Sequence, residues 1–265
     1  MARIFAVTNQ KGGVGKTTTC VNLSASLAAT KRKILMVDLD PQGNATMGSG
    51  IDKNEVDKSA YDVLTKKASI EEVIVRSEAA GFDVLPANGD VTAAEVELLN
   101  EIGREHRLRL ALNKVREKYD FILIDCPPSL NMLTVNALSA SDSVIIPMQC
   151  EYYALEGLAA LMNTIEQIRE TINPSLEIEG ILRTMYDPRN SLTRDVSSQL
   201  HEYFGDQVYG SVIPRNIRLA EAPSYGLPAL KYDKGSKGAL SYLALAGEVV
   251  RKTKAKAKEK AAALA

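Results

Sequence analysis

A glycine-rich loop near the N-terminus constrains the fold of this chain more than any other feature. Residues Gln10 to Thr18 read QKGGVGKTT; they follow the apolar run Ile4–Thr8 and lead into the helix-forming stretch Thr17–Thr30. Glycines let the backbone close around phosphate oxygens, and the first turn of the following helix adds a positive dipole end. This order predicts a phosphate-binding loop, with an ordinary glycine turn as the alternative.

The residues of this loop have separate expected roles. Lys16 is expected to reach the β and γ phosphates of a nucleoside triphosphate, and the Thr17 hydroxyl to ligate Mg²⁺. The predicted nucleotide-binding residues of the loop are Lys11, Gly12, Gly13, Val14, Gly15, Lys16, Thr17 and Thr18.

The rest of the chain alternates short apolar runs with helical patterns. The runs have the length and composition of buried strands, and helix-forming sequence separates them. They lie at Ile34–Val37, Phe121–Ile124, Val144–Ile146 and Ile178–Met185, with the helix Asn131–Ala140 between the second and third. We expect an α/β fold, a single-domain, doubly wound, mostly parallel sheet with helices on both faces, of the P-loop NTPase type.

Cysteine usage and hydropathy exclude several classes of protein. The three cysteines, Cys20, Cys126 and Cys150, show no CxxC spacing, so we expect buried thiols rather than a zinc or redox site. No run approaches 18 apolar residues, and the N-terminus lacks the apolar centre of a signal peptide. The sequence therefore predicts a cytoplasmic protein.

The charge is unevenly distributed along the chain. The net charge is −1, but residues 251–265 carry +5, which leaves −6 for residues 1–250. We therefore divide the chain into a domain at 1–250 and a basic Lys/Ala-rich tail at 251–265. Attraction to a polyanion has to be local, because the body as a whole is acidic.

Three aspartates follow predicted strands. Asp38 and Asp40 come at the end of the second strand, and Asp125 ends the run Phe121–Ile124. Both segments would emerge at the carboxyl edge of the sheet beside the loop, with Asp38 and Asp40 on one side if the strand extends that far. The alternative is that these aspartates cap helices or form turns.

The loop departs from the general Walker A pattern, because Gln10 replaces its first glycine and a second lysine, Lys11, stands beside it. It resembles the deviant Walker A family of ATPases, which includes ParA and Soj partition proteins, MinD and the nitrogenase iron protein. In that family the extra lysine crosses a dimer interface to the partner's nucleotide. The resemblance implies an ATP sandwich dimer in which Lys11 acts in trans, as an arginine finger does; a solvated side chain is the alternative.

The same resemblance assigns roles to further residues. It implies that Asp40 orients the attacking water, and that Asp38 and Asp125 help Thr17 to hold hydrated Mg²⁺. Catalysis then rests on Lys11, Lys16 and Asp40. The string at Val212–Asn216 resembles the family's adenine-side loop, which makes Pro214 and Asn216 nucleotide-binding candidates. The implied activity is weak, Mg²⁺-dependent hydrolysis of ATP to ADP and phosphate.

Longer strings favour one branch of the family. DLDPQGN, DCPPSL and PRNIRLAEAPSYG resemble ParA and Soj proteins, which bind DNA non-specifically as ATP dimers and release it when a ParB-type partner stimulates hydrolysis. Because residue 3 already begins the first strand, we expect no N-terminal helix-turn-helix and no operator-specific binding. This branch implies a nucleoid-associated protein that segregates a chromosome or a plasmid.

The sequence contains no helix lined with arginine that would mark a DNA-binding face. The DNA-binding candidates are Arg189, Arg215, Arg218 and Lys231, with loose contacts from the tail. Solvated surface side chains are the alternative.

Other functions stay open. A MinD-like membrane-associated ATPase that positions cell division is one alternative, although the tail lacks bulky apolar residues and predicts no stable membrane association. A nucleotide-gated scaffold that hardly turns over is another.

Overall fold

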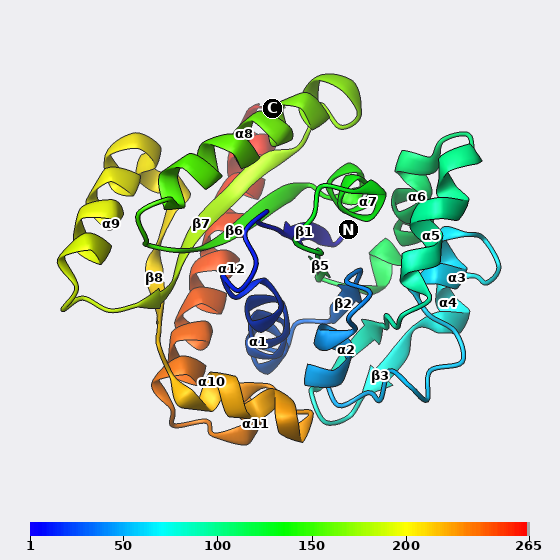
Figure 1. Ribbon diagram of the computed structural model, residues 1–265, viewed down its shortest axis with the longest axis horizontal. Coiled ribbons are helices and arrows are strands. Elements are labelled where there is room, and N and C mark those ends of the chain that lie inside the picture. The colour runs from blue at the N-terminus through cyan, green and yellow to red at the C-terminus, as the bar shows by residue number, and fades with distance from the viewer. Residues whose placement is uncertain (264–265) are drawn as a thin grey trace.

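Within residues 1–263, which the computed structural model describes, eight strands form one sheet in the order β3-β4-β2-β5-β1-β6-β7-β8 (Figure 1). Neighbouring strands are parallel except for the edge pair of β3 and β4. The strands are β1 (Arg3–Val7), β2 (Ile34–Asp38), β3 (Val75–Ser77), β4 (Phe82–Leu85), β5 (Phe121–Asp125), β6 (Ser143–Gln149), β7 (Glu177–Tyr186) and β8 (Val208–Pro214).

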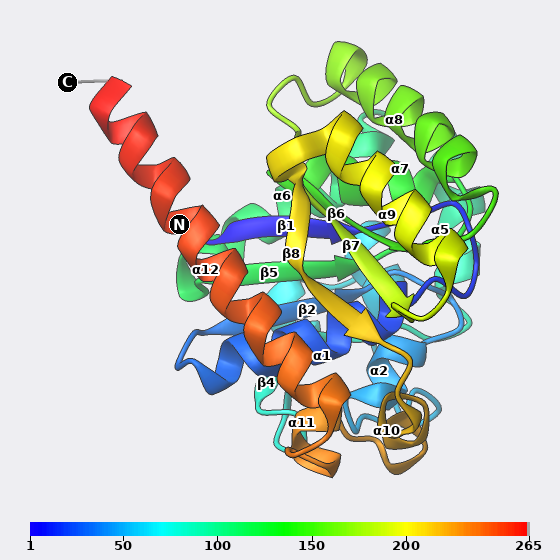
Figure 2. The same ribbon diagram turned by 90° about the vertical axis from the view of Figure 1, so that its left-hand side faces the viewer.

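Helices connect these strands and cover both faces of the sheet (Figures 1 and 2). The α-helices are α1 (Lys16–Ala29), α2 (Asn44–Gly48), α3 (Ala60–Leu64), α4 (Ile70–Val73), α5 (Val91–Glu97), α6 (Arg107–Val115), α7 (Met132–Ala140), α8 (Ala154–Thr171), α9 (Ser191–Phe204), α10 (Ile217–Glu221), α11 (Ala229–Tyr232) and α12 (Lys237–Ala263). Short 3₁₀ turns are η1 (Leu98–Asn100), η2 (Arg104–His106), η3 (Arg116–Lys118), η4 (Gly205–Gln207) and η5 (Ala222–Tyr225).

The strands are apolar on both sides because each side packs against a helical layer. Along β1, Ile4 and Ala6 belong to one buried cluster, and Phe5 and Val7 belong to another. The first cluster includes side chains of α3 to α9, and the second includes side chains of α1, α2 and α10 to α12. Successive strand residues point to opposite faces, so a continuous apolar run fills both cores.

The predicted doubly wound, mostly parallel fold is confirmed, and the predicted elements lie close to where the sequence placed them. Residues 251–263 of the predicted basic tail continue α12 as helix. Alternating Ala and Lys are strong helix formers, so the helix extends past the domain body. Residues 264 and 265 of the predicted tail lie outside the described residues. Among the described helices, none is both long and apolar enough to span a bilayer.

Candidate nucleotide-binding site

The glycine loop joins the carboxyl end of β1 to the first turn of α1. Gly13 and Gly15 have φ of 72° and 89°, in the left-handed region that residues with a Cβ rarely adopt. Gly15 caps α1, and its carbonyl accepts the Thr19 amide at 2.9 Å. The glycines are therefore required by the backbone path that brings the loop into the start of the helix.

A cleft of about 660 Å³ opens above this loop. Loop residues, the segment after β2 and the segment after β8 all line it. The predicted site residues in its lining are Gly12, Gly13, Gly15, Lys16, Thr17, Thr18, Asp40, Pro214, Arg215 and Asn216. One cavity thus brings together phosphate-side and adenine-side candidates that are about 200 positions apart in the chain. Arg215, a DNA-binding candidate, also lies in this cleft.

Asp38 and Asp125 lie side by side in the sheet, where β2 and β5 pair. Both are fully buried. Asp38 accepts hydrogen bonds from the Thr46 amide and hydroxyl at 2.8 and 2.7 Å, and from the Asp40 amide at 3.1 Å. Its carboxylate therefore holds the segment that carries Asp40.

The condition for Asp38 and Asp40 to share a face is not met, because β2 ends at Asp38. A turn follows in which the Gly43 amide donates to the Asp40 carbonyl at 2.8 Å, with Gly43 at φ 61°. Pro41 cannot donate a ladder hydrogen bond, so the strand stops before it. Asp38 is consequently buried, whereas Asp40 lines the cleft.

Asp38 and Asp125 place two buried carboxylates side by side, and a bound cation would stabilise their charged forms. Burial raises the pKa of Asp38 to about 6, while hydrogen bonds from Thr46 act in the opposite direction. Burial and the neighbouring Asp38 raise the pKa of Asp125 well above its ordinary value, and the Thr17 hydroxyl partly offsets this. Apart from this contact with Thr17, both buried oxygens of Asp125 lack a hydrogen-bond partner in residues 1–263. Such an orphaned carboxylate beside a threonine hydroxyl fits hydrated Mg²⁺, a hard cation with oxygen ligands.

Lys16 lines the cleft and is buried. Its Nζ donates to the Lys11 carbonyl at 3.1 Å. Burial lowers the pKa of this ammonium, and the charge of Asp125 partly restores it. A phosphate anion in the cleft would stabilise the charged form, because an opposite charge favours the ionised state.

Lys11 does not line the cleft of its own chain. Its Nζ lies 2.7 Å from a carboxylate oxygen of Glu151, which follows β6, and the side chains are 47% and 43% exposed. Beside this pair, Tyr152 and Tyr153 are 76% and 69% exposed and contact each other edge to face. The expected trans-acting lysine therefore stands at the surface next to an exposed aromatic pair.

Asn216 caps α10, whose residues Ile217, Leu219 and Ala220 also line the cleft. Its side-chain oxygen accepts the Arg218 amide at 3.1 Å. That bond leaves the side-chain amide nitrogen as the donor with which Asn216 can contact a base.

The remaining DNA-binding candidates are exposed at the same edge of the sheet. Arg189 makes a two-pronged contact with Asp187, at 2.9 and 2.8 Å. Arg218 pairs with Glu221 at 2.7 Å and with Asp233 at 3.3 Å. Lys231 lies in the last turn of α11. Both arginines thus carry acidic neighbours that a phosphate would have to displace or share.

Several residues of the site gave no signal in the sequence. The Thr184 hydroxyl, from β7, donates to the Val14 carbonyl at 2.8 Å and fixes the loop from outside. Tyr242, from α12, contacts the Thr19 hydroxyl at 3.0 Å and lines the cleft. Asn44 also lines it. Thr184 and Tyr242 reach the site only through the sheet order and the packing of α12, so no local motif predicts them.

Comparisons with known proteins agree with this geometry. A sequence profile described as AAA domain matches residues 2–178. The sporulation initiation inhibitor protein Soj of Bacillus subtilis (strain 168) is 53% identical over 249 residues, which are 94% of this chain and 98% of Soj. The chromosome partitioning protein ParA of Caulobacter vibrioides is 50% identical over 250 residues, 94% of each chain. The chain belongs to the ParA/Soj family.

A solved structure also resembles this ParA/Soj family member. Cobyrinic acid a,c-diamide synthase from Mycobacterium smegmatis, crystallised with ADP and magnesium, is 38% identical, with a TM-score of 0.84 and 96% of each chain covered. The ParA/Soj fold seen here is therefore shared with a nucleotide-bound protein over nearly its whole length.

Proposed function

We propose that this chain is an ATP-dependent partition protein of the nucleoid. With ATP and Mg²⁺ it forms a sandwich dimer that binds DNA non-specifically. A ParB-type partner stimulates hydrolysis and releases the protein from DNA, which drives the segregation of a chromosome or plasmid. The observation that carries this proposal is the placement of the two lysines, with Lys16 inside the cleft and Lys11 outside it.

The placement of the two lysines supports a nucleotide site that two subunits share. Lys16 serves the nucleotide of its own chain. Lys11 begins in the same loop but points to the surface, where it is held by one half-exposed carboxylate. When two subunits close face to face, Lys11 exchanges Glu151 for the partner's triphosphate. Each nucleotide then has one ammonium from each chain, which makes dimerisation dependent on ATP.

The proposed chemistry is hydrolysis of the γ-phosphate, which needs placement and charge neutralisation more than covalent work. Asp40 accepts a hydrogen bond from the attacking water, and Lys16 and Lys11 neutralise the charge that develops on the phosphate oxygens. Thr17, Asp125 and Asp38, which lies beside Asp125 in the sheet, would hold Mg²⁺. When bound, this ion screens the negative charge of the β and γ phosphates.

Replacing Asp40 tests the catalytic assignment. Asp40→Ala is expected to keep ATP binding and dimerisation while phosphate release stops. Asp52→Ala is the matched control, because Asp52 lies in the loop after α2 and caps a local turn at Asn54 outside the cleft. Unchanged phosphate release from Asp40→Ala would contradict the role of this carboxylate.

Replacing Lys16 tests the binding step separately. Lys16→Ala is expected to abolish nucleotide binding, measured by calorimetry, because no other ammonium of the same chain lines the described cleft. Normal affinity for ATP would contradict the phosphate site.

DNA binding is proposed for Arg189, Arg215, Arg218 and Lys231. These side chains follow β7 and β8 at the carboxyl edge of the sheet, where closure of a dimer doubles the basic surface. Arg218→Glu should remove salt-sensitive DNA binding by the ATP-bound dimer. Arg169→Glu is a close control, because both arginines sit in i,i+3 ion pairs on helices. Equal binding by the two variants would refute this surface.

Co-sedimentation separates this function from a MinD-like one. With ATP, the protein should pellet with plasmid DNA and stay in solution with anionic liposomes. The reverse result would favour a membrane ATPase.

A further inference from the structure

A groove lies along α6, on the flank of the molecule where α3 and α4 pack against that helix (Figure 1). It consists of two adjoining hollows of about 330 and 280 Å³, which share Lys66, Arg107 and Leu110 in their linings. We call it the α6 groove. None of the residues that line it also lines the nucleotide cleft, so the two are separate features of the molecule.

The lining of the α6 groove carries cations but no carboxylate. Lys66, Arg107, Arg109 and Lys114 all contribute to it, and no Asp or Glu of the described chain does. Arg107 is buried and pairs with Glu101, which lies outside the lining. Arg109 and Lys114 are exposed, and neither side chain has an ion-pair or hydrogen-bond partner within residues 1–263. The groove therefore carries positive charge that the chain itself does not neutralise.

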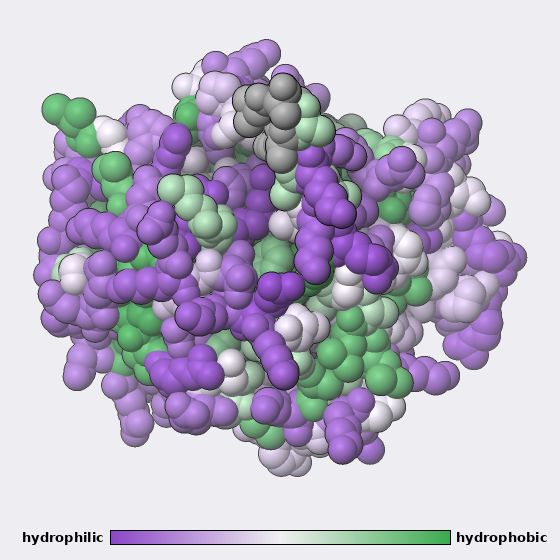
Figure 3. Space-filling model, turned by 180° about the vertical axis from the view of Figure 1, so that it is seen from behind, coloured by the Kyte–Doolittle hydropathy of each residue, from purple (hydrophilic) through white to green (hydrophobic). Residues whose placement is uncertain are grey.

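Apolar side chains lie among these cations. Leu110, which both hollows share, is 58% exposed, and Ile102, in the lining of one of them, is 96% exposed. Val63 and Ile70 are buried and line the other hollow. Figure 3 shows the molecule from behind, with this flank at the left, where hydrophobic side chains stand among hydrophilic ones. Exposed apolar side chains rimmed by charged ones are typical of surfaces that bind another protein.

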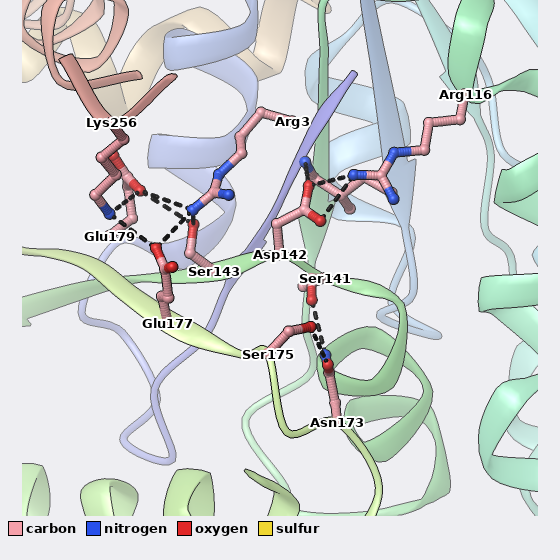
Figure 4. Close-up of polar contacts among 11 residues, drawn as sticks. Arg3, Arg116, Ser141, Asp142, Ser143, Asn173, Ser175, Glu177, Glu179 and Lys256 are labelled. Carbon is pink, nitrogen blue, oxygen red and sulfur yellow. Dashed lines mark hydrogen bonds and ion pairs between the residues drawn. The ribbon is translucent and has the colours of Figure 1, made fainter. Parts of the chain in front are cut away.

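Hydrogen bonds to distant residues fix α6 at both ends. At its start, the Asn136 side chain of α7 accepts the Leu108 amide at 3.1 Å and donates to the Arg104 carbonyl at 2.8 Å. Directly after the helix, Arg116 donates to both carboxylate oxygens of Asp142, at 2.7 and 2.6 Å (Figure 4). The groove is therefore formed before a partner arrives, which lowers the entropy cost of binding.

We propose that the α6 groove is a docking site for an acidic segment of a partner protein, one that also carries bulky apolar side chains. Carboxylates of this segment pair with Lys66, Arg109 and Lys114, and its apolar side chains cover Ile102 and Leu110. Charge complementarity sets the orientation of the segment, and burial of apolar area supplies affinity. The inference goes beyond the proposed function and depends on neither nucleotide nor DNA.

The surroundings of the groove favour a short acidic segment over a nucleic acid. Glu101 and Glu105 stand next to lining residues in the chain, so a duplex laid across the flank would meet these carboxylates. Phosphates and sugars are also polar, and they would leave Ile102 and Leu110 without an apolar contact. A peptide segment supplies both carboxylates and apolar side chains within the reach of the groove.

A random dodecapeptide library displayed on phage tests the groove without knowledge of the partner. It is selected against three nucleotide-free proteins, namely the unaltered chain, the groove variant Arg109→Glu/Lys114→Glu and a control variant. The control, Arg251→Glu/Lys254→Glu, makes the same charge change at exposed positions on α12. Peptides recovered with the unaltered chain and the control, but not with the groove variant, should contain Asp or Glu together with a bulky apolar residue.

Synthetic peptides from this set give the affinities by fluorescence anisotropy. Two exposed ion pairs contribute up to about 30-fold in affinity, so the groove variant should bind about 30-fold more weakly, and the control as the unaltered chain does. Ile102→Ser keeps every charge and removes an exposed apolar side chain, so it should weaken binding by about tenfold. The effect of the charge variant should shrink as salt rises, because exposed charges are screened.

Several results would overturn the inference. One is a library that yields no peptides dependent on the groove, or yields basic ones, and another is an Ile102→Ser variant that binds the peptides normally. Groove-dependent binding of a random-sequence DNA duplex in place of peptides would show a different occupant, as would self-association of the chain that the groove variant abolishes. Peptide binding should be equal with and without ATP and in Lys16→Ala, so the proposed function can fail while this inference holds. Loss of binding in Lys16→Ala would place the peptides in the nucleotide cleft and refute the α6 groove.

Discussion

Glu151→Gln removes the carboxylate that holds Lys11 at the surface of the free subunit. The Nζ–carboxylate distance is 2.7 Å, and both side chains are nearly half exposed. Exposed ion pairs of this kind contribute up to about 1 kcal/mol. If Lys11 has to leave Glu151 to reach the partner's nucleotide, this contribution opposes dimerisation once per subunit.

The expected effect follows from the two-fold symmetry of the proposed dimer. Two broken pairs oppose association by up to about 2 kcal/mol, so Glu151→Gln should lower the dimer dissociation constant by up to about 30-fold. Sedimentation equilibrium with a non-hydrolysable ATP analogue measures this constant. At 1 M salt the difference between variant and unaltered protein should shrink, because the Debye length falls to about 3 Å.

The control for this experiment lies on the adjoining helix. Glu156→Gln makes the same charge change at an exposed position in the first turn of α8, away from Lys11. It should leave dimerisation within about twofold of the unaltered protein, as expected for a surface substitution. Weaker or unchanged dimerisation of Glu151→Gln would refute the reasoning, because Lys11 would then keep Glu151 in the dimer or not take part in it.

Three further predictions concern stability and the DNA surface. A Cβ at Gly180 would stand 2.5 Å from the Tyr209 ring, so Gly180→Ala should lower the free energy of unfolding by about 1–3 kcal/mol in urea. Gly157 lies in a helix with open space around it, so Gly157→Ala should raise the free energy of unfolding by about 0.5–1 kcal/mol. Equal effects of the two substitutions would contradict a clash between the added Cβ at Gly180 and the Tyr209 ring. The Tyr209 hydroxyl is buried without a partner in the described chain, so Tyr209→Phe should stabilise the fold by about 1 kcal/mol; destabilisation would show that the hydroxyl is bonded. The hydrogen bond from Arg189 lowers the pKa of Asp187 to about 2, so the pair is intact at neutral pH and is lost only as the pH falls toward that value. Asp187→Asn should therefore tighten DNA binding by the ATP-bound dimer, measured by anisotropy, and weaker binding would mean that Asp187 positions Arg189.

The sequence predicted what depends on local pattern. Apolar runs such as Phe121–Ile124 became central strands because both of their faces are covered. The glycines of the loop were predictable because a left-handed backbone and a helix start leave few other choices. That the acidic residues at the ends of β2 and β5 lie together was predictable because parallel strands end at a common edge.

What the sequence could not predict depends on tertiary contacts. Thr184 supports the loop from a strand about 170 residues away, and nothing around it marks this role. The extent of β2 decided that Asp38 is buried and Asp40 is not, and strand ends are hard to place from composition. The pairing of Lys11 with Glu151 and of Lys256 with Glu179 depends on sheet order, which propensity does not encode.

The mass of the Asp40→Ala protein in solution tests the central claim most directly. Light scattering with saturating ATP and Mg²⁺ should give twice the mass of the 28.8 kDa chain, and Lys11→Ala in the same background should return it to the monomer. A monomer under these conditions, or a dimer that persists without Lys11, would contradict the central claim. That claim is that Lys11 of each subunit contacts the partner's nucleotide and so makes dimerisation depend on ATP.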